Sequence, residues 1–289
     1  MSRKKAVLLG LFDGLHRGHM SAVGEFLKQS GEKTVFTFDS ATMTTKGRRG
    51  LLMSDGEKRE RLCTLGVDKV VSKDFSEYKD IAPDVFVREV LIGRLGAETV
   101  ICGENFRFGR GGTADAAQLF DLCKSAGAKA IIVPTVFDGG EPISTSRIRG
   151  LIEEGKIGEA NRLLGYPYSF SGEIIHGDRI GTSIGIKTVN IGFDPERALP
   201  KKGVYASRAE IGGKVYSGVT NVGTRPTVHE DGKIVIETHL IDFDGDVYGK
   251  RATVSLLEFL REERRFGSLE ELRLTVANDI NTVKETVRL

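Results

Sequence analysis

The chain has 289 residues, a near-neutral formal charge of +2 and 39% hydrophobic residues. This composition is typical of a soluble globular protein and lacks the strongly basic balance of nucleic-acid-binding domains. The three cysteines have no paired spacing, which argues against a disulfide framework and a cysteine zinc site. No run approaches the roughly 20 apolar residues of a membrane helix. We therefore expect a cytoplasmic protein with neither nucleic acid nor membrane as a partner.

The first half of the chain alternates strand and helix patterns. Strands are expected at 6–12, 34–38, 69–71, 99–102 and 130–133, and helices at 19–28, 57–65, 84–92 and 114–125. Such alternation predicts βαβ units that form a parallel sheet. In sheets of this kind ligands bind beyond the carboxyl ends of the strands.

The pattern changes in the second half. Helices are expected at 145–154 and 157–164, then strands at 203–211, 214–222, 234–243 and 251–260, and a final helix at 268–287. Short strands divided by turns such as Gly212-Gly213 and Asp231-Gly232 predict an antiparallel sandwich or barrel. At roughly 100–200 residues per domain the length favours two domains, which we place at 1–163 and 164–289.

A decapeptide directly after the first strand carries the strongest local signal. Its sequence, GLFDGLHRGH at 10–19, places His16 and His19 three residues apart at a strand-to-helix turn. Gly14 and Gly18 allow the backbone to approach a ligand closely. The helix that follows turns its amides and the positive end of its dipole toward the same place, which favours an anion. The segment therefore predicts a phosphate site.

Three segments together resemble a known family. The decapeptide resembles the GxFDxxHxGH motif of the nucleotidyltransferase superfamily, in which the histidines contact the α-phosphate of a nucleotide. The loop GENFRFG at 103–109 and the segment ISTSRIR at 143–149 resemble motifs of its FAD synthetase branch. This resemblance implies His16, His19 and Arg147 as catalytic residues. It implies nucleotide or flavin contacts for Gly10, Phe12, Asp13, Gly14, Gly18, Asn105, Phe106, Phe108, Ser144, Thr145, Ser146 and Arg149.

The segment 172–191 resembles the opening of the bacterial flavokinase domain. The resemblance implies a flap over phosphates at Gly177, Gly181 and Gly185, and Mg²⁺ ligands at Thr188 and Asn190. Hydroxyl and amide oxygens are ligands of the hard type that Mg²⁺ prefers. It also implies Glu237 as the general base. The segment 260–266 resembles the stretch beside the flavin ring, which implies flavin contacts for Arg261 and Glu262.

The order of these motifs is similar to that of the bifunctional riboflavin kinase/FAD synthetase family. The resemblance implies an α/β N-terminal domain with a Rossmann-like parallel sheet and a C-terminal antiparallel β-barrel with a terminal α-helix. It implies that ATP phosphorylates riboflavin to FMN, and that a second ATP adenylylates FMN to FAD with release of pyrophosphate. The implied partners are these small molecules with Mg²⁺; no oligomeric state is implied.

Two departures from the family pattern keep alternatives open. Lys187 replaces the proline that precedes the Mg²⁺-binding threonine, and 38–42 replaces a proline-histidine-proline-like stretch. One alternative is therefore an FAD synthetase whose C-terminal half binds flavin but has lost kinase activity. Another is a related cytidylyltransferase or pantetheine-phosphate adenylyltransferase. The loop at 103–109 and the whole C-terminal half disfavour the second, because those smaller enzymes lack both.

Overall fold

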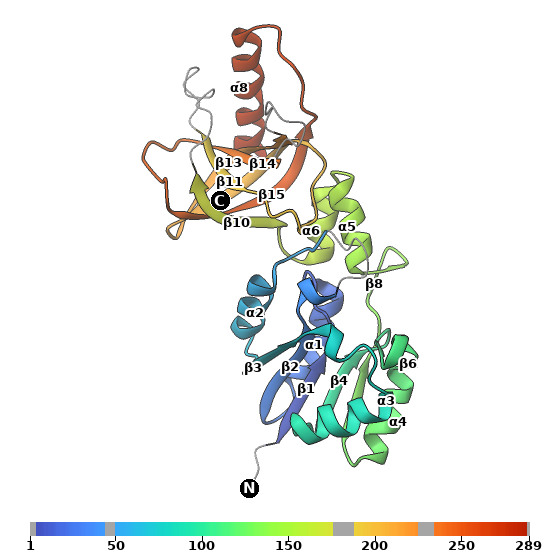
Figure 1. Ribbon diagram of the computed structural model, residues 1–289. Coiled ribbons are helices and arrows are strands. Elements are labelled where there is room, and N and C mark those ends of the chain that lie inside the picture. Colours follow the sequence, from blue (N-terminus) through green and yellow to red (C-terminus); the bar gives the residue numbers. More distant parts are fainter. Residues whose placement is uncertain (1–3, 44–49, 176–187, 225–233, 288–289) are drawn as a thin grey trace. The chain divides into compact units, whose positions relative to one another are not determined.

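A computed structural model describes residues 4–43, 50–175, 188–224 and 234–287 (Figure 1). The chain divides into two compact units, Met1–Arg147 and Ile148–Leu289. The first contains a five-stranded parallel sheet with helices, and the second contains a closed six-stranded antiparallel barrel with a C-terminal helix. This confirms the fold class expected from the sequence. The domain boundary at 163/164 stays a prediction.

The parallel sheet of the first unit has the strand order β3-β2-β1-β4-β7. Its strands are β1 (Lys5–Leu9), β2 (Glu32–Phe38), β3 (Lys69–Lys73), β4 (Thr99–Gly103) and β7 (Lys129–Val133). Strand β1 pairs with β2 on one side and with β4 on the other, so the order of the strands reverses at β1. Ligands of open α/β sheets bind at such a switch point, beyond the carboxyl ends of the strands.

Helical segments and short strands connect the sheet. The helical segments are α1 (Arg17–Leu27), η1 (Ser40–Thr42), α2 (Asp55–Thr64), η2 (Phe75–Glu77), α3 (Pro83–Val85), the π-helical η3 (Phe86–Arg94), η4 (Arg110–Gly112) and α4 (Ala116–Ser125). The short strands are β5 (Arg107–Phe108), β6 (Ala114–Asp115), β8 (Phe137–Asp138) and β9 (Glu141–Pro142), and they form the hairpin pairs β5–β6 and β8–β9.

Both faces of strand β1 are covered. Val7 and Leu9 belong to a buried apolar cluster that includes Val90 of η3 and Leu119 of α4. Residues at alternate positions of a strand point to opposite faces, so Leu8 faces the other side, where α1 contacts β1 and β4. A central strand buried on both faces explains its continuous apolar sequence.

Several element boundaries differ from those expected, and two of the differences have a local structural cause. Strand β1 ends at Leu9 rather than at residue 12, because Phe12 adopts a left-handed φ of 54° that no strand accommodates. The fourth helix begins at Ala116 rather than at residue 114, because Ala114–Asp115 pair with β5. Asp115 then caps the helix by accepting a hydrogen bond from the N–H of Gln118 at 3.0 Å.

The second unit is built on a barrel closed in the order β10-β11-β14-β13-β12-β15. Its strands are β10 (Ser169–Ile175), β11 (Thr188–Gly192), β12 (Gly203–Ile211), β13 (Lys214–Thr224), β14 (Ile234–Leu240) and β15 (Arg251–Arg261). Helices α5 (Thr145–Glu153), which begins in the first unit, and α6 (Ile157–Leu164) precede the barrel, and α8 (Leu269–Thr286) follows it. The sequence pattern did not predict β10 and β11.

Helices α6 and α8 pack against strands of the barrel, α6 on β15 and α8 on β12 and β13. Helix α8 packs through Val283 against Val204 of β12 and Val219 of β13. The guanidinium of Arg261, at the end of β15, binds the carboxylate of Asp279 on α8, with the shortest N–O distance 2.8 Å. Both attachments fix α8 to the barrel by apolar contact and by a charged pair.

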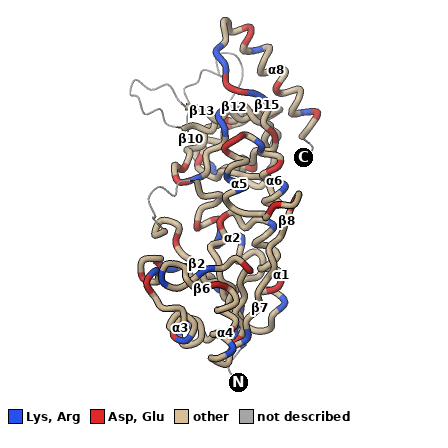
Figure 2. Tube along the Cα trace, turned by 90° about the vertical axis from the view of Figure 1, so that its right-hand side faces the viewer, with Lys and Arg blue, Asp and Glu red and all other residues tan. Residues whose placement is uncertain are grey.

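Charged residues of both signs are interspersed along the chain rather than gathered on one side of the tube in view (Figure 2). Among the described helices, none combines the length and apolar character that a membrane crossing requires.

Candidate active sites

A cavity of about 500 Å³ lies at the carboxyl ends of the strands in the first unit. Three segments far apart in the sequence line it. They contribute Gly10, Phe12, Asp13, His16, Gly18 and His19; Asn105, Phe106 and Phe108; and Ser144 and Thr145. The parallel sheet brings together most of the residues that the sequence predicts for the first site.

The two imidazoles stack within this cavity. The ring centroids of His16 and His19 lie 3.6 Å apart with an interplanar angle of 17°. His16 is the N-cap of α1, and its Nδ1 accepts a hydrogen bond from the backbone N–H of His19 at 3.3 Å. That bond leaves the ring proton on Nε2 when the imidazole is neutral. His19 Nδ1 is buried and has no hydrogen-bond partner among the described residues.

Burial keeps both rings uncharged near neutral pH. Removal from water lowers the pKa of His16 to about 4. Burial first, and then the charges of His16 and Lys58, hold the pKa of His19 well below its usual value. Neutral imidazoles in this position act as hydrogen-bond donors and do not carry a fixed charge.

The loop that carries the histidines is held in an unusual conformation. Phe12 and Leu15 have φ values of 54° and 35°, a region that costs non-glycine residues of order 1–3 kcal/mol. Asp13 holds the loop, since its Oδ1 accepts the N–H of Leu52 at 2.8 Å and its carbonyl accepts the hydroxyl of Thr145 at 3.1 Å. A Cβ on Gly18 would lie 3.1 Å from the His16 ring, so glycine permits the close packing of the loop.

Aromatic side chains form a further part of the cavity wall. Phe106 stacks on Phe108 with centroids 5.7 Å apart, and Phe108 contacts Phe86 of η3. Further aromatic residues that sequence reasoning missed also line the cavity: Phe36, Phe38, Phe75, Tyr78 and Phe86. Their apolar spacing indicated only a core, and the folded sheet was needed to show which of them face the cavity. Aromatic side chains in a cavity can stack on, or meet edge to face, a planar ring system.

Arg147 lies outside the lining of the cavity. Its guanidinium donates to the carbonyls of Asp138 and Glu141 at 3.0 and 3.2 Å and pairs with the Glu141 carboxylate at 3.2 Å. The hairpin β8–β9 therefore holds this side chain. Other predicted contacts outside the lining are Gly14, at φ 80° in the histidine loop, Ser146, and Arg149 in the second unit.

The second unit brings three predicted residues together on neighbouring strands. The hydroxyl of Thr188 donates to Oε1 of Glu237 at 2.6 Å. Asn190 on β11 lies directly opposite Glu237 on β14, so the two side chains share one face of the wall. Asn190 is buried, and its Nδ2 has no hydrogen-bond partner among the described residues.

Asn221 and Glu263, to which the sequence motifs assigned no site role, lie beside this group. Asn221 on β13 lies opposite Glu237 on the other side of β14, and its Nδ2 donates to Glu263 at 3.0 Å. Its buried Oδ1 has no partner in the described part of the chain. A Cβ on Gly223 would lie 2.1 Å from the Glu263 carboxylate, so glycine leaves the space that this carboxylate occupies.

The predicted flavin contacts at 261–262 have partners elsewhere. Arg261 binds Asp279 of α8, and Glu262 pairs with Lys201 at 2.8 Å with most of its side chain exposed. The adjacent Glu263 accepts a hydrogen bond from Asn221, the residue opposite Glu237 on the neighbouring strand. The predicted flap glycines Gly177, Gly181 and Gly185, together with Lys187, lie outside the described residues.

Comparison with known proteins follows the same division of the chain. A family model described as FAD synthetase matches residues 1–147, and one described as riboflavin kinase matches 164–287. Curated proteins of Listeria monocytogenes and Escherichia coli, both named bifunctional riboflavin kinase/FMN adenylyltransferase, are 32% and 33% identical to this chain. The matches cover 95% and 96% of this chain, and 90% and 91% of the relatives. The chain belongs to the bifunctional riboflavin kinase/FMN adenylyltransferase family.

A solved structure extends the likeness in three dimensions. A crystal structure from Streptococcus pneumoniae, described as a macrolide-efflux protein, is 27% identical with a TM-score of 0.87. The likeness covers 99% of this chain and 96% of that one. The α/β unit followed by a barrel is therefore an architecture that the two chains share over nearly their full length. Both halves of the bifunctional family are present in this chain, as the sequence motifs predicted.

Proposed function

We propose that the chain phosphorylates riboflavin to FMN in its second unit and adenylylates FMN to FAD in its first, using one ATP for each step. The observation that carries this proposal is the convergence of three distant motifs on one cavity lined by paired imidazoles and an aromatic wall. The contact between Thr188 and Glu237 supports the kinase step. Full-length relatives named for both activities argue against the loss of one.

For adenylylation, a phosphate oxygen of FMN attacks the α-phosphorus of ATP. The bond from that phosphorus to the bridging oxygen of the β-phosphate breaks, and pyrophosphate leaves. The imidazole N–H groups of His16 and His19 donate hydrogen bonds to the α-phosphate, while the start of α1 turns its backbone N–H groups toward it. Such transfer depends on positioning and on stabilisation of developing charge, with no covalent enzyme intermediate. The aromatic wall and Asn105 receive flat rings.

To contact the phosphates of ATP, Arg147 must exchange its present hydrogen-bond partners for phosphate oxygens. In the structure its guanidinium is bound by Asp138 and Glu141 of the hairpin β8–β9. Phosphate oxygens are strong bidentate acceptors for a guanidinium, so a bound polyphosphate competes with these carboxylates for the same donors. We include Arg147 as a phosphate contact made on binding, with Ser144, Thr145, Ser146 and Arg149 at the same helix start.

For phosphorylation, Glu237 orients the 5′-hydroxyl of riboflavin and accepts its proton as the oxygen attacks the γ-phosphorus of ATP. The bond from that phosphorus to the oxygen that bridges the β- and γ-phosphates breaks, and ADP leaves with FMN formed. The hydroxyl of Thr188 and the amide of Asn190 offer the neutral oxygen ligands that fit Mg²⁺ together with phosphate oxygens. When bound, Mg²⁺ would neutralise charge on the transferred phosphate. Both steps use small molecules of the cytoplasm, where we place the protein.

A time course with riboflavin and MgATP tests the proposal. FMN is expected to appear before FAD, and the purified protein supplied with FMN and MgATP is expected to release pyrophosphate and form FAD. A protein that forms FAD from FMN but no FMN from riboflavin would contradict the kinase assignment. Failure to form FAD from either flavin would contradict the assignment of the first unit.

Single substitutions separate the two sites. His19→Ala is expected to lower kcat for FAD formation by at least about 100-fold and to leave FMN formation unchanged, since the imidazole contacts only the adenylylation site. Glu237→Gln is expected to lower kcat for FMN formation by a similar factor of about 100 or more and to spare FAD formation from FMN. Each variant is the fold control for the other. Equal loss of both activities in either variant would show that the sites are not separate.

A further inference from the structure

Lys58 of α2 is a buried lysine that the proposed mechanism does not use. Only 4% of the residue is exposed, which is rare for a lysine. Its Nζ lies 3.3 Å from the carbonyl oxygen of Leu11, 3.4 Å from that of Phe38 and 3.5 Å from the hydroxyl of Thr37. It also forms a 2.8 Å ion pair with Asp55, one turn earlier on the same helix. A buried ammonium group therefore meets four oxygen partners.

These partners join the ends of two central strands. Leu11 lies in the loop after β1, five residues before His16, and Phe38 is the last residue of β2. The carbonyl of Leu11 also accepts the hydroxyl of Thr37 at 3.3 Å, so two donors hold it. Leu11 and Phe38 both line the adenylylation cavity. Lys58 thus ties the histidine loop to the neighbouring strand from behind the cavity wall.

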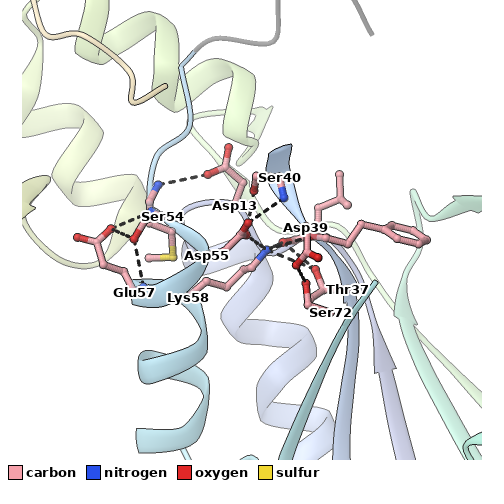
Figure 3. Close-up of polar contacts among 12 residues, drawn as sticks. Asp13, Thr37, Asp39, Ser40, Ser54, Asp55, Glu57, Lys58 and Ser72 are labelled. Atoms are coloured by element: carbon pink, nitrogen blue, oxygen red, sulfur yellow. Dashed lines mark hydrogen bonds and ion pairs between the residues drawn. The ribbon is translucent and has the colours of Figure 1, made fainter. Parts of the chain in front are cut away.

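Asp55, the ion-pair partner of Lys58, also forms hydrogen bonds with the segment that follows β2. Its carboxylate accepts the backbone N–H of Ser40 at 2.8 Å and the hydroxyl of Ser40 at 2.9 Å (Figure 3). Burial disfavours its ionisation, but the hydrogen bonds from Lys58 and Ser40 outweigh that effect and lower the pKa of Asp55. Nearby, the Ser72 hydroxyl at the end of β3 binds Asp39. Polar contacts thus join the carboxyl ends of β1, β2 and β3.

We propose that Lys58 is a positioning residue for adenylyl transfer: it holds the loop after β1, and with it the stacked pair His16–His19, in the geometry that receives the α-phosphate. The strained backbone of this loop at Phe12 supports the need for such a restraint, because residues in a left-handed conformation persist only when their surroundings impose it. The inference rests on the proposed function, since the loop is taken as the α-phosphate site.

Kinetic constants of Lys58→Met test this role. Methionine fills a similar volume but donates no hydrogen bond and carries no charge. We expect kcat for FAD formation from FMN to fall by about 30- to 100-fold, because displacement of catalytic groups by about 1 Å costs this much. The KM values for ATP and FMN should change by less than about 3-fold, since the cavity lining remains. FMN formation in the second unit should be unchanged.

The matched control is Lys124→Met, which removes an exposed lysine of α4 outside the cavity lining. The kcat and KM values of this variant should equal those of the protein without a substitution. Rates are referred to the folded fraction, measured by circular dichroism at the assay temperature. If Lys58→Met does not fold, Lys58→Gln, which retains an N–H donor, is expected to lose about 10-fold in kcat. An unchanged kcat per folded molecule would overturn the proposal.

Imidazole NMR spectra give a measurement that does not depend on activity. The ring signals of His16 and His19 are expected to shift in Lys58→Met and to stay in place in Lys124→Met. Unchanged histidine signals would overturn the positioning role even if the rate falls. If the unchanged protein forms no FAD, the proposed function fails, and these spectra alone decide whether Lys58 holds the histidine loop.

Discussion

The stacked histidines are neutral because they are buried away from water. Their protonation therefore affects the free energy of unfolding of the protein. His16 has a pKa of about 4 in the folded chain, against about 6.5 in an unfolded one. Between these values the unfolded chain binds a proton at this position and the native chain does not. Protons therefore favour unfolding over this interval, and the stability contributed by the neutral ring is complete only above about pH 6.5.

We predict that the free energy of unfolding falls as pH is lowered from about 6.5 to 4. His16 alone contributes at most roughly 3 kcal/mol to this fall, from about 1.4 kcal/mol per unit of pKa difference. Denaturant unfolding at pH 7.5 and pH 5 measures the change. The variant His16→Asn should lose part of this pH dependence; an identical pH dependence in both proteins would contradict the burial of the ring. An imidazole titration by NMR gives the pKa directly.

At the residue scale, spacing within a short motif was the most informative signal. The pattern of 10–19 predicted His16 and His19, and the fold places both at the cavity. Lys58 had no such signal, because one lysine on an otherwise ordinary charged helix is normally exposed. The ion pair between Glu262 and Lys201 could not be predicted from the sequence either. It depends on where β15 ends, and the glutamate just beyond that end pairs with Lys201.

At the scale of elements, α8 is held to the barrel by a small apolar contact and by charged pairs, of which Arg261–Asp279 is more buried than Lys284–Asp242. The carboxylate of Asp279 is nearly buried, with its side chain 9% exposed, and it receives three hydrogen bonds from Arg261. Removal of one partner of such a pair leaves the other charge poorly solvated. The helix should therefore depend on this pair more than on any surface charge of its own.

Asp279→Asn is predicted to lower the free energy of unfolding of the second unit by about 2 kcal/mol. This is below the roughly 3–5 kcal/mol typical of a fully buried pair, because water still reaches Arg261, which is 23% exposed. Thermal unfolding of the full chain measures the loss. Glu285→Gln, an exposed substitution on the same helix, serves as the control and should have no effect. Equal midpoints for the two variants would contradict the docking role of the pair.

Periodicity predicted the parallel sheet but only part of the barrel. Strands β12 to β15 have 7 to 11 residues each with partly alternating patterns, and each was expected. Strand β10 includes Gly172, where a Cβ would lie 2.5 Å from the Ile191 side chain. Strand β11 has only five residues. A glycine and a short length weaken the sequence pattern of a strand, so β10 and β11 are recognised only from their pairing with neighbouring strands.

At the scale of the whole molecule, the position of the boundary between the two units determines which fragments of the chain should fold independently. The compact units meet between residues 147 and 148, whereas the sequence favoured 163/164. Helix α6 lies between these positions and buries Ile157, Ala160, Leu163 and Leu164. Its Asn161 donates to the carbonyl of Leu256 on β15 at 2.8 Å and accepts the N–H of Tyr168 at 2.7 Å.

We predict that a fragment of residues 148–289 is more stable than one of residues 164–289. Loss of α6 exposes apolar surface on β15 and removes both hydrogen bonds of Asn161, which should cost on the order of 3 kcal/mol or more. Urea unfolding of the two fragments, followed by circular dichroism, measures the difference. Equal midpoints would support the boundary at 163/164.

The circular pairing of the barrel limits how the kinase half can change its length. Along β14, the polar Glu237 and the interior Ile236 and Thr238 alternate. Removal of one residue before Glu237 would carry the carboxylate to the inside of the wall and bring the side chain of Thr238, which is no general base, to the reacting position. Because a closed ring has no outer strand to absorb the shift, neighbouring strands would also lose their partners. Insertions and deletions tolerated during evolution should therefore fall in the connections between strands and not within them.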